Sequence, residues 1–447
     1  MEHDVLVIGG GLAGLQTARL LQRAGRRVQV LEARDRVGGR TLSTTIDDAV
    51  FDLGGQWLGH GQLRLQKLAQ ELGIATYPQY TQGKRILVAD GKVRTYAGTI
   101  PRLAPWKLIE IQLAMMRLAR LTRRISPHAP LAADHAAELD SVSLEHMARR
   151  WLYSRTSRNL LAAAVRVVFG AEMSDISLLY ALSYFHAGGG FEALIEAEKG
   201  AQAARFVGGA QALSLAIASE LSVRVQTSAP VRSLRQDARG VSVATDRGTY
   251  RAHRAVLAIP PPLWSRIDFS PLLPVLHEQL SQRAPMGATV KAVATYDRPF
   301  WREAGLSGEA VFDQGPVSVT FDATTSDGAR PALLAFVVGQ QARTWSSRGC
   351  SERQTAVLAA LGRCFGPQAR EPRKYCEQDW STEAWTRGCP VSVLGTGVLS
   401  SCAPALRAPF GCVHLAGTET AREHTGYLEG ALESAERACA EVCAALS

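Results

Sequence analysis

The chain has 447 residues, of which 46% are hydrophobic and 20% charged, an ordinary composition for a globular protein that argues against a disordered chain. Fifty basic against 41 acidic residues give a net charge of +9, but the basic residues are dispersed, so we expect no nucleic-acid partner. No stretch approaches the roughly 18 apolar residues of a membrane span, and no secretory signal opens the chain. We therefore expect a cytoplasmic protein without an integral membrane anchor.

The first forty residues predict a nucleotide site. Residues 4–8 form a β-branched, apolar run, residues 12–21 have helical spacing, and residues 28–31 form a second strand. A GxGxxG pattern at Gly9, Gly11 and Gly14 joins the first strand to the helix, and Glu32 ends the second strand. This arrangement is typical of a dinucleotide-binding βαβ unit.

Each residue of the pattern has a physical role in such a unit. Gly9 permits the tight turn, Gly11 lets the backbone approach a pyrophosphate, and Gly14 allows close packing of helix on strand. The carboxylate of Glu32 would bind a ribose hydroxyl. The helix that begins beyond Gly11 would point its positive end at the phosphates.

The middle of the chain alternates helical and strand patterns without an internal repeat. The spacing of apolar residues predicts further helices and strands in this region, and they contain no motif that indicates a function by itself. Helices are expected over residues 107–125, 144–168, 177–185, 211–221 and 353–364, and strands over 86–89, 223–226, 240–244, 255–259, 289–296, 317–321, 332–338 and 412–416. A last helix is expected to begin near residue 426.

The predicted helix over residues 107–125 is strongly basic. It carries Lys107 and four arginines, Arg117, Arg120, Arg123 and Arg124, against the single acid Glu110. A basic amphipathic helix can lie on a membrane surface. The commoner arrangement, which we favour here, packs one face on the domain and exposes the other to water.

The cysteines do not indicate a metal site. All eight lie in the last hundred residues, and none forms a CxxC pair. Without an export signal they are interpreted as reduced thiols, some of them buried.

Several segments together resemble the flavin-dependent monoamine oxidase family, and they follow its order along nearly the whole chain. Besides the opening glycines, the carriers are LEARDRVGGRT at 31–41, DLGGQW at 52–57, FVGG at 206–209, AIPP at 258–261, AGTET at 416–420 and GYLEG at 426–430. The first of these are shared with the wider flavoprotein superfamily, whereas the last two are typical of amine oxidases.

The resemblance implies an α/β fold with a discontinuous Rossmann-like FAD-binding domain and an α+β substrate domain. The FAD-binding domain would comprise residues 1–80, 205–285 and 375–447, and the substrate domain residues 81–204 and 286–374. The partners would be a small-molecule amine and O2. A homodimer is left open.

The resemblance also assigns residues to the cofactor. Glu32 would bind the adenosine ribose, Arg34, Gly39 and Arg40 would lie by the pyrophosphate, and the main chain at Val231 would pair with adenine. The full set of expected cofactor-binding residues is Gly9, Gly11, Ala13, Gly14, Glu32, Arg34, Gly39, Arg40, Gly55, Gln56, Trp57, Val231, Trp380, Cys389, Gly417, Thr418, Tyr427 and Leu428. The helix that begins near Gly426 would point its positive end at the flavin ring.

Two residues would carry the chemistry. Lys291 is the one charged residue in the segment GATVKAV, and the family match implies that it holds a water against the flavin and assists the reaction with oxygen. The alternative is a strand-edge lysine that reaches water. Tyr427 would form one wall of an aromatic cage that guides a neutral amine, rather than being a packed core tyrosine. Trp380 would pack near the flavin, or be a plain core tryptophan.

Cys389 falls where mitochondrial members of the family carry a cysteine bonded to the flavin 8α-methyl group. Many bacterial relatives lack this bond, so a free thiol beside a non-covalent flavin is equally compatible with the sequence. The next residue, which is the second cage aromatic in those mitochondrial members, is Pro390 here. The cage is therefore incomplete, which leaves the choice of amine open.

The predicted activity is FAD-dependent oxidation of an amine to an imine and then a carbonyl product, with reduction of O2 to H2O2. An amino acid oxidase or a flavin-dependent desaturase is the alternative, but Gln56-Trp57 stand where a carboxylate-binding arginine would be wanted. A protein-binding flavoprotein is disfavoured because no basic patch interleaved with aromatics is present.

Overall fold

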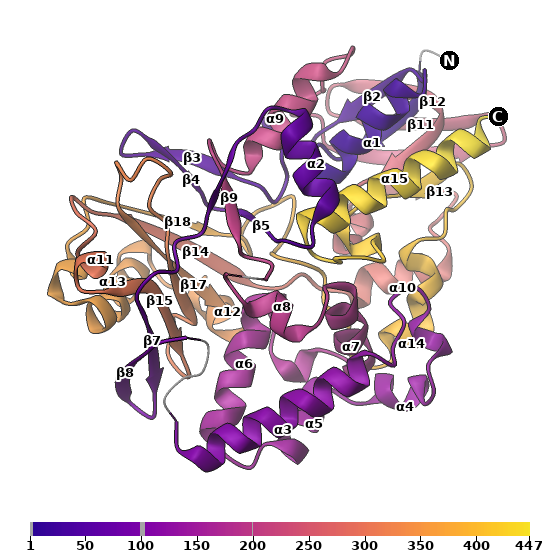
Figure 1. Cartoon of the computed structure of the whole chain (residues 1–447). Helices are drawn as coiled ribbons and strands as arrows, with labels where there is room; N and C mark the ends of the chain where they lie inside the picture. The colour runs from indigo at the N-terminus through magenta and orange to yellow at the C-terminus, as the bar shows by residue number, and fades with distance from the viewer. Residues whose placement is uncertain (1–2, 99–102, 199) are drawn as a thin grey trace.

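The computed structural model describes residues 3–98, 103–198 and 200–447. Two large mixed sheets lie side by side, and a group of helices packs below the space between them (Figure 1). The first sheet runs in the order β13 (Asp268–Ser270), β10 (Val231–Asp237), β11 (Gly240–Thr245), β12 (Gly248–Leu257), β1 (His3–Ile8), β2 (Val28–Leu31), with β19 (Val413–Leu415) also on β12.

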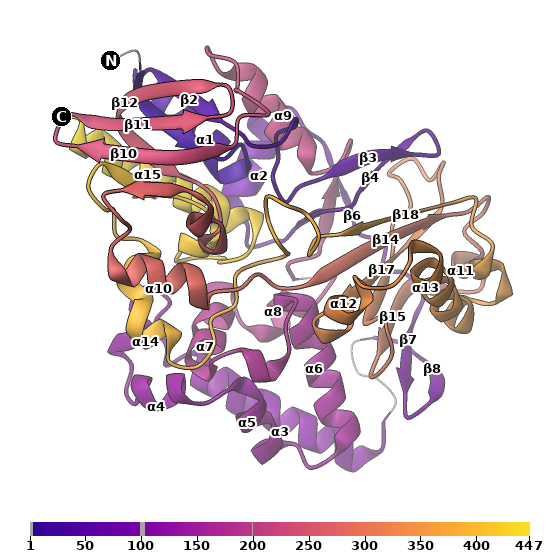
Figure 2. The ribbon, with the colours of Figure 1, turned by 180° about the vertical axis from the view of Figure 1, so that it is seen from behind.

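The nucleotide-binding unit predicted from the first residues is present. Strand β1 pairs in parallel with β2 and with β12, and helix α1 (Leu12–Arg23) connects β1 to β2. All four residues of β2 are buried, although β2 is the last strand in this order. The long C-terminal helix α15 (Leu428–Ala445) packs on α1, so that the two ends of the chain meet (Figure 2).

The second sheet is built mainly from the later half of the chain. Its order is β18 (Lys374–Asp379), β14 (Thr289–Thr295), β17 (Ala332–Val338), β16 (Val319–Asp322), β15 (Leu306–Phe312), β7 (Lys84–Ala89), β8 (Lys92–Tyr96). Strand β18 pairs with β14, although the predicted domain boundary at residue 375 assigns it to the FAD-binding domain. The division into domains otherwise stays a prediction.

Helices complete the molecule. Those below the sheets are α3 (Pro105–Thr122), α4 (Ala136–Ser141), α5 (Leu144–Trp151), α6 (Arg155–Phe169), α7 (Leu178–Ala187) and α8 (Phe191–Ile195), and they form much of the largest apolar cluster. The others are α2 (Leu63–Glu71), α9 (Gln211–Glu220), α10 (Val275–Arg283), α11 (Phe300–Glu303), α12 (Gln340–Trp345), α13 (Cys350–Phe365) and α14 (Val398–Cys402).

Small sheets join the larger parts. Strands β3 (Ser43–Ile46) and β4 (Ala49–Asp52) form a hairpin, and β5 (Trp57–Leu58) and β6 (Thr76–Pro78) both pair with β9 (Ala204–Phe206). No helix among the described residues is long and apolar enough to cross a membrane. The eight cysteines are all free, and Cys364 and Cys402 are buried.

Two predicted elements were wrong. The helix expected over residues 144–168 is divided into α5 and α6, because the Glu110 carboxylate accepts hydrogen bonds from the amides of Tyr153 and Ser154, and Ser154 then caps α6. The strand expected over residues 223–226 is only a single bridge from Gln226 to Leu31. Both outcomes depend on contacts between distant segments, which periodicity does not report.

Candidate active site

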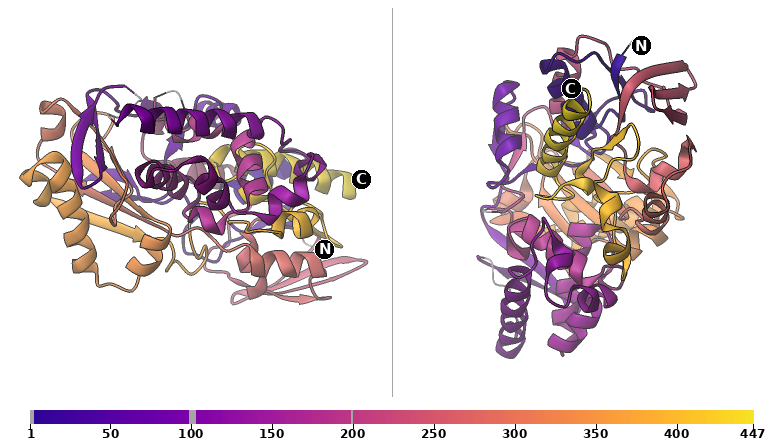
Figure 3. Two further views of the ribbon diagram at one scale, coloured as in Figure 1. Left: turned by 90° about the horizontal axis from the view of Figure 1, so that it is seen from below. Right: turned by 90° about the vertical axis from the view of Figure 1, so that its right-hand side faces the viewer.

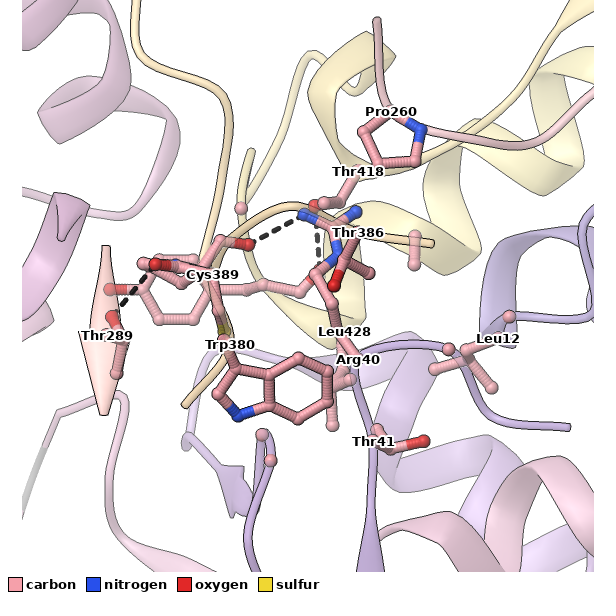
Figure 4. Close-up of a pocket in the computed structure, with 18 of the residues that line it drawn as sticks. Leu12, Arg40, Thr41, Pro260, Thr289, Trp380, Thr386, Cys389, Thr418 and Leu428 are labelled. Carbon is pink, nitrogen blue, oxygen red and sulfur yellow. Dashed lines mark hydrogen bonds between the residues drawn. The ribbon is translucent and has the colours of Figure 1, made fainter. Parts of the chain in front are cut away.

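One cavity is lined by residues from both ends of the chain and from both sheets. The opening segment contributes Gly9, Gly11, Ala13, Glu32 and Arg34, and the closing segment contributes Gly417, Thr418, Tyr427 and Leu428. The other predicted residues on its wall are Gly39, Arg40, Gly55, Gln56, Trp57, Lys291, Trp380 and Cys389. Figure 4 shows Arg40, Trp380, Cys389, Thr418 and Leu428 around this space.

The glycines of the opening segment are held close to other backbone or border the cavity. A Cβ at Gly9 would lie 2.6 Å from the carbonyl oxygen of Ala258, and a Cβ at Gly14 would lie 2.0 Å from that of Gly9. A Cβ at Gly11 would meet only the Cα of Gly39, at 3.9 Å, and would therefore occupy the cavity. The N-terminus of α1 has no side-chain cap, which leaves its amides for a ligand.

The Glu32 carboxylate holds this end of the site together. The amide of Gly10 donates to its Oε2 at 2.6 Å, and the amide of Arg34 donates to its Oε1 at 2.8 Å. The Arg34 guanidinium is ion-paired with both Glu32 and Glu383. Glu32 is thus fixed at the end of β2, where a ribose would meet it.

Arg40 links the beginning of the chain to its end. Its Nη1 and Nη2 donate to Oε1 and Oε2 of Glu419 at 2.5 and 3.0 Å, a bidentate pair, and Nη1 also donates to the carbonyl of Pro390 at 2.7 Å. The Glu419 side chain is almost wholly buried. The AGTET segment is therefore tied to the cavity by a charge pair as well as by packing.

Lys291 is buried in the middle of β14, between β17 and β18, with 1% of its side chain exposed. Its Nζ donates to the carbonyl of Gly54 at 3.0 Å and to Oε1 of Gln56, and it lies 5.9 Å from the centre of the Trp57 ring. Burial lowers the pKa of Lys291 to about 7, against a smaller opposing effect of Asp52. The interpretation as a strand-edge lysine that reaches water was wrong.

Aromatic side chains form the far end of the cavity. Tyr427 and Tyr184 of α7 have ring centres 6.3 Å apart, and Trp57 lies 5.8 Å from Phe336 of β17. Burial raises the pKa of both tyrosines, so both stay neutral. The indole of Trp380 donates to the carbonyl of Leu53 at 2.9 Å. Tyr184 is thus an aromatic neighbour of Tyr427.

Cys389 lies on the same wall, held by its backbone. Its amide donates to the carbonyl of Gly287 at 2.8 Å, and its carbonyl accepts from the hydroxyl of Thr289 at 2.8 Å (Figure 4). Burial raises the pKa of the Cys389 thiol to about 11, although Arg40 and Lys291 act in the opposite direction.

Two predicted site residues do not line the cavity. Gly14 packs against Gly9 instead, as its expected role in helix–strand packing requires. Val231 begins β10, two residues after Ala229, whose amide donates to the carbonyl of Glu32 at 2.9 Å. The predicted contact of Val231 with adenine stays a prediction.

The sequence did not indicate several wall residues that the structure brings to the aromatic end. They are Val167, Val168, Tyr184, Leu194, Gln202 and Phe336. Four of the six, Val167, Val168, Tyr184 and Phe336, come from predicted helices or strands in which they look like ordinary core positions, so no local signal separates them from packing residues. Only the crossing of α6, α7, α8 and β17 brings them together.

The cavity fits a flavin dinucleotide. Among the described residues on its wall, the buried Nε2 of Gln56 and Nε of Arg34 have no hydrogen-bond partner, which is costly unless a ligand supplies one. A glycine-rich turn at the uncapped N-terminus of α1 and an apolar chamber with one lysine at the other end are compatible with a nucleotide-dependent oxidoreductase.

Comparison with known proteins identifies the family. The family model "Flavin containing amine oxidoreductase" matches residues 12–443. The chain is 38% identical to a probable flavin-containing monoamine oxidase A of Dictyostelium discoideum, over 98% of this chain and 97% of the other. A structure of putrescine oxidase with bound putrescine has a TM-score of 0.96 at 33% identity over 99% of both chains. Cyclohexylamine oxidase of Brevibacterium oxydans has a TM-score of 0.96 at 31% identity over the whole of both chains.

The chain therefore belongs to the flavin-containing amine oxidoreductases, enzymes that oxidise amines with FAD and O2. The predicted family, the fold and the amine oxidase activity are confirmed.

Proposed function

We propose that this enzyme oxidises a neutral, largely apolar monoamine at the aromatic end of the cavity, with Lys291 and Tyr427 as the residues next to the reaction. The proposal rests on the few charged residues that line the cavity. Among the described lining residues, the charged ones are Glu32, Arg34, Arg40 and Lys291, and the first three are ion-paired with protein partners. A second ammonium group on the substrate would thus find no free carboxylate at this end, and the one cation there, Lys291, is already bonded to Gly54 and Gln56.

The residues would act mainly by binding and orientation. Tyr427, Tyr184 and Phe336 enclose an apolar space, where burial disfavours a charged ammonium and selects the uncharged amine. The bound flavin supplies the acceptor for two electrons, so that the amine leaves as an imine, water gives the carbonyl product, and O2 is reduced to H2O2. Lys291, fixed by Gly54 and Gln56, would hold a water molecule and assist the step with oxygen.

A panel of substrates tests this assignment. We expect H2O2 and flavin bleaching with benzylamine and cyclohexylamine, and a kcat/KM for putrescine lower by about tenfold or more, because its second charged amine would be buried without a partner. Bleaching by an amino acid but by no amine would favour the alternative amino acid oxidase. Putrescine as the best substrate would contradict the monoamine assignment while leaving amine oxidation intact.

We further propose that the flavin is bound covalently through the Cys389 sulfur. Support comes from the position of this cysteine on the cavity wall, where the side chains of Arg40 and Lys291 partly offset the effect of burial, which raises the pKa of its thiol. The acid-precipitated protein should retain yellow colour in the pellet, and Cys389→Ser should release all of it to the supernatant. Colour entirely in the wild-type supernatant would exclude the bond and leave a non-covalent flavin.

A cytoplasmic location remains part of the proposal, and cell fractionation with a peroxide assay of each fraction tests it. Most activity in an extracellular fraction would contradict it.

A further inference from the structure

Helix α3 carries an apolar stripe on its outer side. Its inner side packs through Ala114, Leu118 and Thr122, which are buried. The outer side presents four large apolar residues, Trp106, Ile109, Leu113 and Met116, each between 48% and 61% exposed. Their spacing of three, four and three residues places them along one line of the helix. The stripe is about 15 Å long at 1.5 Å per residue.

A helix face that contacts only water would not be expected to carry this row of large apolar side chains. The expected arrangement was a helix with one packed face and one solvated face, and the solvated face is normally polar. A contiguous line of exposed tryptophan and aliphatic side chains marks a surface that meets an apolar partner. Tyr153, which is 83% exposed, lies beside the helix, since its amide is bonded to Glu110.

Four arginines continue the stripe toward the C-terminal end of α3. Arg117, Arg120, Arg123 and Arg124 are exposed, and within the described residues their side chains have no hydrogen bond or ion pair. Cations near a helix C-terminus are favourable in themselves because they interact with the helix dipole. That interaction does not explain why an apolar stripe lies beside them. The single acid of the helix, Glu110, is turned inward to the amides of Tyr153 and Ser154.

We propose that the α3 surface, defined as Trp106, Ile109, Leu113 and Met116 with the four arginines, binds the surface of an anionic lipid bilayer. The apolar stripe would enter the boundary between headgroups and acyl chains while the guanidinium groups meet lipid phosphates. Figure 3 shows α3 at the edge of the molecule when seen from below, and the exposure of the four apolar residues comes from their accessible surface.

Charge complementarity favours a bilayer over a second copy of the chain. A symmetric pair through α3 would bring arginines against arginines or against the apolar stripe, because the outer face of the helix holds no carboxylate to meet them. An anionic membrane supplies both the negative charge and the apolar layer that this surface lacks.

Sedimentation of the holoenzyme with lipid vesicles tests the proposal. We expect binding to vesicles of phosphatidylcholine with phosphatidylglycerol, weak binding to phosphatidylcholine alone, and loss of binding as salt is raised. The double variant Ile109→Glu, Leu113→Glu should bind at least about tenfold more weakly, and each Arg→Gln change at positions 117 and 120 should weaken binding by about fivefold.

Matched controls lie on other surfaces. Leu272→Glu changes an apolar residue that is 84% exposed, and Arg251→Gln removes an exposed charge, and neither should alter vesicle binding. Amine oxidation in solution should be unchanged in all these variants. Equal vesicle binding by the double variant, or none by the wild type, would overturn the proposal. Dimers in light scattering that Leu113→Glu abolishes would assign the surface to a second copy instead.

Discussion

At the scale of single residues, Lys291 is the most informative position. An ammonium group in the middle of a buried strand is unfavourable unless it is hydrogen-bonded, and its two protein partners are neutral oxygens of Gly54 and Gln56. The fold thus keeps a lysine whose pKa is about 7 beside the proposed flavin ring. Such a group is able to exchange a proton near neutral pH.

Replacing Lys291 should slow the reaction of the reduced flavin with oxygen much more than the reaction with the amine. In Lys291→Met we expect reoxidation of the reduced flavin by O2 to slow by about 100-fold, the typical effect of losing a positioned proton donor or acceptor. Reduction by the amine should change far less. Stopped-flow absorbance measures both steps, and an unchanged reoxidation rate would remove Lys291 from the proposed mechanism.

The lowered pKa of Lys291 also predicts that the stability of the folded protein depends on pH. The folded-state pKa of Lys291, about 7, is below its ordinary value of 10.5, so between these values the unfolded chain binds more protons than the folded one. The contribution of this residue to stability therefore rises with pH over that window. The free energy of unfolding, measured with urea at several pH values, should rise with pH more steeply in the wild type than in Lys291→Met. Parallel profiles would show that Lys291 keeps an ordinary pKa.

At the scale of elements, the contact between β1 and α1 decides whether the opening turn forms. A Cβ on Gly14 would lie 2.0 Å from the carbonyl oxygen of Gly9, which is backbone and has little freedom to move aside. Gly14→Ala should therefore lower the free energy of unfolding by about 3 kcal/mol, the upper end for overpacking, and weaken flavin binding. Gly349→Ala is the control, because a Cβ there meets nothing within 4 Å. Similar urea midpoints for the two variants would contradict the packing argument.

Elements were predictable where their own residues decide them. Strand β14, helix α13 and the βαβ unit follow from runs of apolar residues and from glycines. Strand β10 contains only two apolar residues and was not predicted; it is a strand because β11 and β13 pair with it. The same limit explains the division between α5 and α6, which a carboxylate on α3 imposes.

At the scale of the whole molecule, the proposed flavin would add contacts between parts of the chain that are far apart in the sequence. Both sheets and both ends of the chain contribute to one cavity. In the Cys389→Ser variant, whose flavin is removable, the apoprotein should be less stable by about 4 kcal/mol relative to protein with flavin at a thousandfold its Kd. Hydrogen exchange should quicken in residues 9–14 and 417–431 but not in β15 and β16. Uniform protection in both states would contradict this coupling.

The sequence by itself determined the nucleotide fold, the family and most of the glycine-rich part of the cavity wall, because each depends on glycines and charges that lie close together along the chain. The predicted catalytic pair also lies on the cavity wall. Only the tertiary structure decided the apolar chamber, where Tyr184 faces Tyr427 and Phe336 faces Trp57. It also decided which face of α3 stays uncovered. Packing residues from separate helices and strands carry the same local pattern whether they fill a core or line a cavity, so their role is set only when those elements meet.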